Sequence, residues 1–207
     1  MTRLRYISKN YKHLNNAGNK AKTDIEIILS EDGALNAGLE RTVGLGAVRG
    51  YARTLGSVIA SCFRLKKGDV LLLQYPFKKY YDFVVARALK RGAKVVTVIH
   101  DLGSFRRKRL TVEEEIARLN RSSVVVVHSP AMLDWLRAHG LKAEMVVLGL
   151  FDYLSDSIPR RKHEKPGNRP RLMFAGKCSP SDNGWIYELA RTEPGVDLVL
   201  YGGGVDQ

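Results

Sequence analysis

Short apolar runs alternate along the chain with longer stretches in which apolar residues recur at helical spacing. The apolar runs predict strands at residues 4–8, 70–74, 94–99, 124–128 and 145–148. The stretches between them predict helices at residues 20–29, 48–63, 80–90, 112–119 and 131–139, the last one ended by Gly140. Strands that alternate with helices are typical of a parallel sheet wrapped by helices. The first part of the chain is therefore predicted to be an α/β, Rossmann-like domain with helices on both faces of its sheet.

The pattern inside single elements adds detail to this prediction. The runs at residues 94–99 and 124–128 are rich in β-branched residues without polar alternation, which favours central strands covered on both faces. Helical spacing places Ile25, Ile28 and Leu29 on one face of the first helix. The second helix has a longer apolar face, made of Val48, Leu55, Ile59 and Phe63.

The pattern changes after Tyr153, where the segment SDSIPRRKHEKPGNRP has three prolines, several charges and almost no apolar residues. This composition indicates a linker at residues 155–169, after a first domain at 1–154. Residues 170–207 then predict two strands, 171–175 and 197–201, around a helix near 185–190. Such a unit is too small to close its own core. We therefore expect the start of a second Rossmann-like lobe, truncated at Gln207.

Composition and charge narrow the classes of function. With 44% hydrophobic and 27% charged residues the chain should fold, and it has neither an apolar run of membrane-spanning length nor a signal core, so we expect a cytoplasmic protein. The net charge of +13 implies an anionic partner. Lys and Arg fall in separate short groups, which disfavours nucleic acid and leaves a solvated surface or peripheral contact with an anionic membrane. The two distant cysteines are expected to be free thiols without zinc.

Polar side chains follow the predicted strands where a ligand site would lie. Ligands of open α/β sheets bind at the carboxyl ends of the strands, and Gln74, His100 and His128 all occupy such ends. His100 is followed by Asp101, and an aspartate or histidine held near an acceptor hydroxyl can act as a general base for inverting glycosyl transfer. We take Asp101 as the candidate base. The alternative is that His100 closes the strand with a backbone hydrogen bond and Asp101 caps the next turn.

Three further segments are candidates for substrate binding. Arg106, in a group of four basic residues, could place a guanidinium over a diphosphate or a phospholipid headgroup, or be solvated. Ser129 suits the N-cap of the helix that begins at Pro130, and a helix N-terminus also favours phosphate or sugar oxygens. The early loop with Asn16, Gly18 and Lys20 lies where backbone often approaches a ligand, although a plain turn explains it equally.

Taken in order, the segments KAKTDIEIIL, KKGDVLLLQYPF, VVTVIHDLGSFR, VVVVHSPAMLDWLRAHG and VVLGLFDYL resemble a family of bacterial GT-B glycosyltransferases. This family includes glucosyltransferases of adhesin glycosylation and β-1,6-galactofuranosyltransferases. The resemblance spans residues 15–154 and implies the acceptor-side lobe of the fold. The segment RLMFAGKCSPS resembles the start of the nucleotide-sugar-binding lobe, except that Lys177 follows Gly176 where relatives often have asparagine.

The resemblance also implies a site and a reaction. It implies that the interlobe cleft is lined by Asn16, Gly18, Lys20, Gln74, Tyr75, His100, Asp101, Arg106, His128 and Ser129, with residues 151–153 approaching the hinge. The reaction would move a hexose from a nucleotide-diphosphate carrier, UDP in the first place, to a glycan or glycoprotein hydroxyl in surface polysaccharide or glycoconjugate synthesis. It needs no cofactor or metal, and relatives indicate that self-association can occur.

Because most donor contacts lie in the second lobe, we expect little or no transfer by these 207 residues alone. Two alternatives to the enzyme stay open, namely a noncatalytic sugar- or nucleotide-binding module and a basic nucleic-acid-binding protein. An Asp101→Ala variant of a full-length version separates the first from the enzyme, since it would spare binding and abolish transfer. Nucleic-acid binding would instead weaken steeply with salt.

Overall fold

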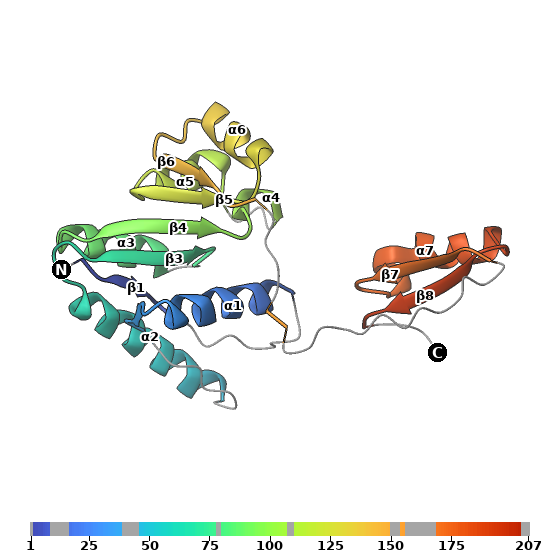
Figure 1. Cartoon of the computed structure of the whole chain (residues 1–207), viewed down its shortest axis with the longest axis horizontal. Helices are drawn as coiled ribbons and strands as arrows, with labels where there is room; N and C mark the ends of the chain where they lie inside the picture. The colour runs from blue at the N-terminus through green and yellow to red at the C-terminus, as the bar shows by residue number, and fades with distance from the viewer. Residues whose placement is uncertain are drawn as a thin grey trace. The chain divides into compact units, whose positions relative to one another are not determined.

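The computed structural model describes residues 2–8, 17–38, 46–77, 80–106, 110–149, 154–155 and 169–203. The chain divides into two compact units, Met1–Ser155 and Asp156–Gln207 (Figure 1). The first unit carries all the candidate site residues.

A parallel sheet forms the centre of the first unit. Its described strands are β1 (Leu4–Tyr6), β2 (Leu35–Asn36), β3 (Val70–Tyr75), β4 (Lys94–Ile99), β5 (Val124–Val127) and β6 (Glu144–Val147). They lie in the order β2-β1-β3-β4-β5-β6, and every neighbouring pair is parallel. Tyr75 lies beside Ile99, and Val98 lies beside Val126. This register brings the residues that follow β3, β4 and β5 to the same edge of the sheet.

Helices cover both faces of the sheet, as the sequence predicts, but unevenly. They are α1 (Ala17–Glu31), α2 (Ala47–Arg64), α3 (Tyr81–Lys90), α4 (Gly103–Arg106), α5 (Val112–Leu119) and α6 (Pro130–Ala138). Side chains alternate across a strand, so Leu71 and Leu73 of β3 enter the large core with α2, α3, α5 and α6. Leu72 faces the other way, into a smaller cluster with Leu29 of α1. The predicted α/β, Rossmann-like class is confirmed.

Several expected elements differ from the structure in extent or in orientation. The strand β2 and the helix α4 were not predicted, because elements of two and four residues are too short to show a period. The predicted apolar face of α2 forms, but Val48 and Phe63 on it are 82% and 61% exposed. The helix instead packs on the sheet through Val58 and Cys62, which are 1% and 3% exposed.

The described part of the second unit contains two paired parallel strands, which are connected in the sequence by a helix. Its described elements are β7 (Arg171–Ala175), α7 (Pro180–Thr192) and β8 (Asp197–Tyr201). β7 and β8 pair in parallel from Arg171 beside Asp197 to Ala175 beside Tyr201. Parallel strands need such a crossover connection, and the two predicted strands and the predicted helix are all present.

Candidate functional site

An open pocket lies at the carboxyl edge of the sheet of the first unit. Its volume is about 190 Å³, and it is lined by His100, Asp101, Leu102, Phe105, Met132 and Trp135. The lining comes from the end of β4 and the adjoining helix α4, and from α6, which is distant from them in the sequence. Asp101 is half-buried there, between the strand and α4. The pocket therefore holds both residues that the sequence put forward for catalysis.

His100 is fixed by its neighbours on β3 and α1. Its backbone N–H donates to the Tyr75 carbonyl at 3.0 Å, which extends the β3–β4 pairing by one residue. The Gln74 amide nitrogen donates to the Lys22 carbonyl at 2.9 Å, so the Gln74 amide oxygen faces His100 Nε2 at 2.8 Å. An amide oxygen can only accept a hydrogen bond, so Nε2 of His100 carries the proton. In the neutral imidazole, Nδ1 then has no proton and can accept a hydrogen bond.

The surroundings of His100 keep its imidazole neutral. Burial lowers its pKa from 6.5 to about 4, helped by the positive charge of Lys22 and by the nearby His128. The rings of His100 and His128 lie 6.0 Å apart between centroids. His100 is thus a hydrogen-bonding group at neutral pH, and a weak base.

A pH dependence of folding follows from this low pKa. The unfolded chain binds the His100 proton more tightly than the folded chain, so lowering the pH from 6.5 to 4 should remove about 2–3 kcal/mol of stability. Urea unfolding of the wild type and of His100→Gln at pH 7, 5.5 and 4 measures this. The wild type should lose more stability than the variant across this interval. Parallel pH curves for the two proteins would contradict it.

His128 and Ser129 lie where β5 passes into α6. Ser129 is the N-cap of α6, its hydroxyl oxygen accepts the Met132 N–H at 3.2 Å, and Pro130 occupies the first turn. The predicted capping role is thus present in the structure. His128 is half-buried beside His100, so β4 and β5 each contribute one imidazole to the same edge.

A buried carboxylate that the sequence interpretation missed organises the wall of the pocket. Glu115 of α5 is 1% exposed and accepts four hydrogen bonds. The donors are the Tyr75 hydroxyl at 2.6 Å, the Gly103 N–H at 2.7 Å, and the N–H and hydroxyl of Ser104 at 3.0 and 2.6 Å. The carboxylate therefore binds the first turn of α4 directly after Asp101 and Leu102.

Tyr75, a predicted substrate contact, is part of this arrangement. Its side chain is 2% exposed, and burial together with the bond to Glu115 raises its pKa. Glu115 could have been noticed in the sequence, because it falls on the same helical face as the buried Leu119, where a solvated acid is not expected.

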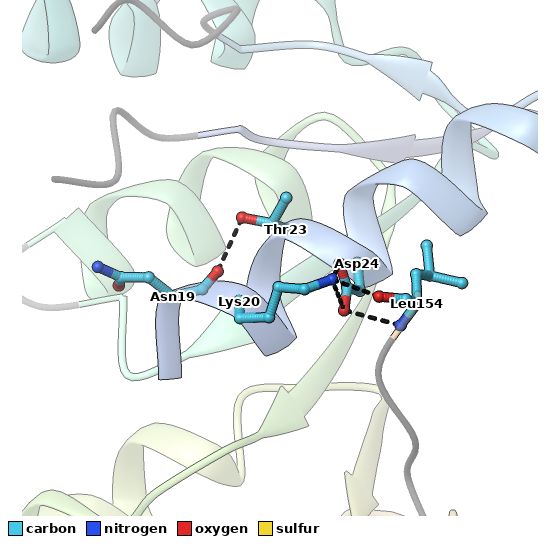
Figure 2. A network of polar contacts seen from close by, with 5 residues as sticks. All are labelled: Asn19, Lys20, Thr23, Asp24 and Leu154. Atoms are coloured by element: carbon cyan, nitrogen blue, oxygen red, sulfur yellow. Dashed lines mark hydrogen bonds and ion pairs between the residues drawn. The ribbon is translucent and has the colours of Figure 1, made fainter. Parts of the chain in front are cut away.

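Gly18 and Lys20 were predicted in a loop, but they lie in the first turns of α1, where Lys20 joins a different network (Figure 2). The Lys20 ammonium donates to both oxygens of the fully buried Asp24, at 2.6 and 2.7 Å, and to the Leu154 carbonyl at 2.7 Å. The Leu154 N–H donates to Asp24 at 3.0 Å. Lys20 thus fastens the chain near residue 154 to α1. Gly18 is exposed in the first turn of the same helix.

Some predicted residues cannot be placed in the site. Asn16 and residues 151–153 lie outside the described residues, and Arg106 ends α4 without a described side chain. Among the described side chains, no group of three His, Cys, Asp or Glu could hold a metal ion.

The fold is that of an α/β protein with an open pocket at the carboxyl ends of its strands, where such folds bind their ligands. Residues 4–150 match the family described as "Glucosyltransferase 3-like, N-terminal domain", and the chain belongs to this family. It is 27% identical over 153 residues to "Glucosyltransferase 3" of Streptococcus parasanguinis, covering 67% of the chain and 42% of that protein. It is 28% identical over 144 residues to "Glucosyltransferase 3" of Streptococcus gordonii, covering 66% and 41%. The chain thus spans about two fifths of the length of these curated relatives. The expected resemblance is confirmed at the level of a glucosyltransferase-like family.

Proposed function

We propose that residues 1–154 are the acceptor-side lobe of a GT-B glycosyltransferase and that residues 170–207 begin its nucleotide-sugar-binding lobe. The enzyme transfers a hexose from a nucleotide-diphosphate sugar, UDP-linked, to a hydroxyl group of a glycan or glycoprotein in surface polysaccharide or glycoconjugate synthesis. One observation carries the proposal: within the segment that matches the family, Asp101 and His100 line an open pocket at the carboxyl edge of the sheet.

The proposed chemistry assigns one role to each of these two side chains. The Asp101 carboxylate takes the proton of the acceptor hydroxyl while the hydroxyl oxygen attacks the anomeric carbon of the donor sugar. The bond from that carbon to the diphosphate oxygen breaks, and its electron pair leaves with the diphosphate. His100 does not take this proton, because protonation would create a cation that burial and the nearby Lys22 disfavour. It positions the hydroxyl instead, by accepting a hydrogen bond at Nδ1.

An aromatic wall supplies the rest of the proposed acceptor site. Phe105 is 58% exposed, and its ring centroid lies 4.5 Å from that of Trp135. Trp135 is in turn stacked on His139 at 3.9 Å, which restricts its rotation. A sugar ring presents an apolar C–H face, and covering that face with an aromatic ring removes apolar area from water. The acceptor sugar is proposed to lie on these rings with one hydroxyl toward Asp101.

A tryptophan substitution tests the aromatic wall. Trp135→Ala should weaken the binding of a simple glycoside about tenfold, since roughly 1.4 kcal/mol of ring contact is lost. Saturation-transfer NMR with methyl β-glucoside and methyl β-galactofuranoside measures it. Trp185→Ala is the matched control, because Trp185 is exposed on α7 in the second unit. Equal losses of glycoside affinity in the two variants would show that Phe105 and Trp135 are not part of the acceptor site.

The reaction itself is tested by mass spectrometry. A full-length version with a complete second lobe should add one hexose to a glycan acceptor from at least one member of a panel of UDP-hexoses. The 207-residue chain should give little or no product under the same conditions. Absence of transfer by the full-length version with every donor and a range of glycan acceptors would overturn the proposal.

A further inference from the structure

The outward side of α2 carries an exposed apolar stripe. Val48, Tyr51, Ile59 and Phe63 are 82%, 49%, 41% and 61% exposed, and helical spacing brings them to one side of the helix. Figure 1 shows the amino-terminal half of α2 extending past the strands of the sheet. A continuous row of exposed apolar side chains marks an interaction surface. We call these four residues the α2 stripe.

Positive charge surrounds the α2 stripe. Arg49 and Arg53 flank it and are exposed, and the sequence of α2 contains three arginines and no acidic residue. The neighbouring helix α3 and the turn after it add exposed cations, namely Arg87, Lys90 and Arg91. The acid of α3, Asp82, is paired with Arg118 at 3.0 Å and with Arg121 at 3.5 Å. The stripe and its surroundings are therefore strongly basic.

Apolar and charged groups meet at the carboxyl-terminal end of α2. A hollow of about 210 Å³ there is lined by Cys62, Phe63, Arg87, Lys90 and Arg91. The Arg91 guanidinium lies 5.5 Å from the centroid of the Phe63 ring. The three cations around this hollow can bind a phosphate group. The exposed Phe63 ring beside them can enter an apolar environment.

We propose that the α2 stripe and its surrounding cations bind the surface of an anionic membrane. Helices that lie in a membrane interface combine an apolar side with flanking Lys and Arg, and each basic residue near an anionic surface adds about 1 kcal/mol. The apolar side chains enter the boundary between headgroups and acyl chains, and the cations meet lipid phosphates. A second copy of this surface would bring like charges together, and nucleic acid offers no partner for Val48 and Ile59. The inference does not depend on the proposed transferase reaction.

Sedimentation of the full 207-residue chain with phospholipid vesicles tests the proposal without any sugar donor. The chain should bind vesicles containing 30% phosphatidylglycerol and should not bind pure phosphatidylcholine. Arg49→Glu combined with Arg53→Glu should weaken binding at least tenfold. Val48→Ser combined with Phe63→Ser should also weaken it several-fold, because the apolar contribution is lost without a change of charge.

The matched control is Arg137→Glu combined with Lys142→Glu. It makes the same change of net charge at exposed positions of α6 and the turn after it, and should retain most of the binding. Equal losses in the two charge variants, or no binding to anionic vesicles, would overturn the proposal. So would a dimer in sedimentation velocity that the Val48→Ser, Phe63→Ser pair dissociates. Tighter binding to a single-stranded oligonucleotide, lost with Arg49→Glu and Arg53→Glu, would assign the surface to nucleic acid instead.

Discussion

Asp101→Asn is expected to slow hexose transfer by about 10²–10⁴-fold in a full-length version of the protein, because the amide cannot take the acceptor proton. Asn has nearly the same size, so the pocket wall should be preserved and the affinity for simple glycosides should change less than threefold. Transfer is measured by mass spectrometry with the donor that the wild type uses, and binding by NMR on the same proteins.

The combination of these two readouts separates the enzyme from a noncatalytic module. A module would bind sugars without transfer in the wild type, and the substitution would change nothing. Asp134→Asn is a suitable control, since Asp134 is an exposed acid of α6 near the same pocket. If the Asp101→Asn variant retains the wild-type rate, Asp101 is not the base. The assignment of the fold would not be affected by that result.

Glu115→Ala should cost about 3 kcal/mol or more of stability, because it leaves the buried Tyr75 hydroxyl and the half-buried donors of Gly103 and Ser104 without their acceptor. For a chain of this size, such a loss corresponds to a Tm lower by roughly 6–12 °C. Calorimetry of the full chain measures this. Glu113→Gln is the matched control, since Glu113 is exposed on the same helix and should shift the Tm by a degree or two at most.

A milder variant tests what Glu115 does for the pocket. Glu115→Gln keeps the volume but presents an amide N–H to donors, so the first turn of α4 should open more often. Hydrogen exchange at the Gly103 and Ser104 amides should then become at least tenfold faster, while exchange in β3 and β4 stays nearly unchanged. Unchanged protection of these two amides would contradict the view that Glu115 positions the loop after Asp101.

Much of the fold was predictable from the sequence because the signals are local and repeated. Runs such as VVTVI and VVVV form β4 and β5, and Ser129-Pro130 marks the start of α6. The parallel register then brings His100 and His128 to one edge, so part of the site also follows from the pattern.

The rest depends on contacts between residues that are distant in the chain. The role of Glu115 arises from four donors on two other elements, and a single sequence does not show which donors will be adjacent. Periodicity correctly groups Val48, Ile59 and Phe63, but it does not tell which side of α2 meets the sheet. That choice is made by tertiary packing, which buries Val58 and Cys62 in the core.

The claim that a sugar acceptor binds in the pocket between the end of β4, α4 and α6 can be tested on this chain by ¹H–¹⁵N NMR. Titration with methyl β-glucoside and methyl β-galactofuranoside should shift the amide signals of His100, Asp101 and Phe105 and the indole signal of Trp135. Signals of α2, such as that of Ile59, should stay in place. Shifts confined to other parts of the chain, or no shifts at high millimolar sugar, would contradict the assignment of this pocket to the acceptor.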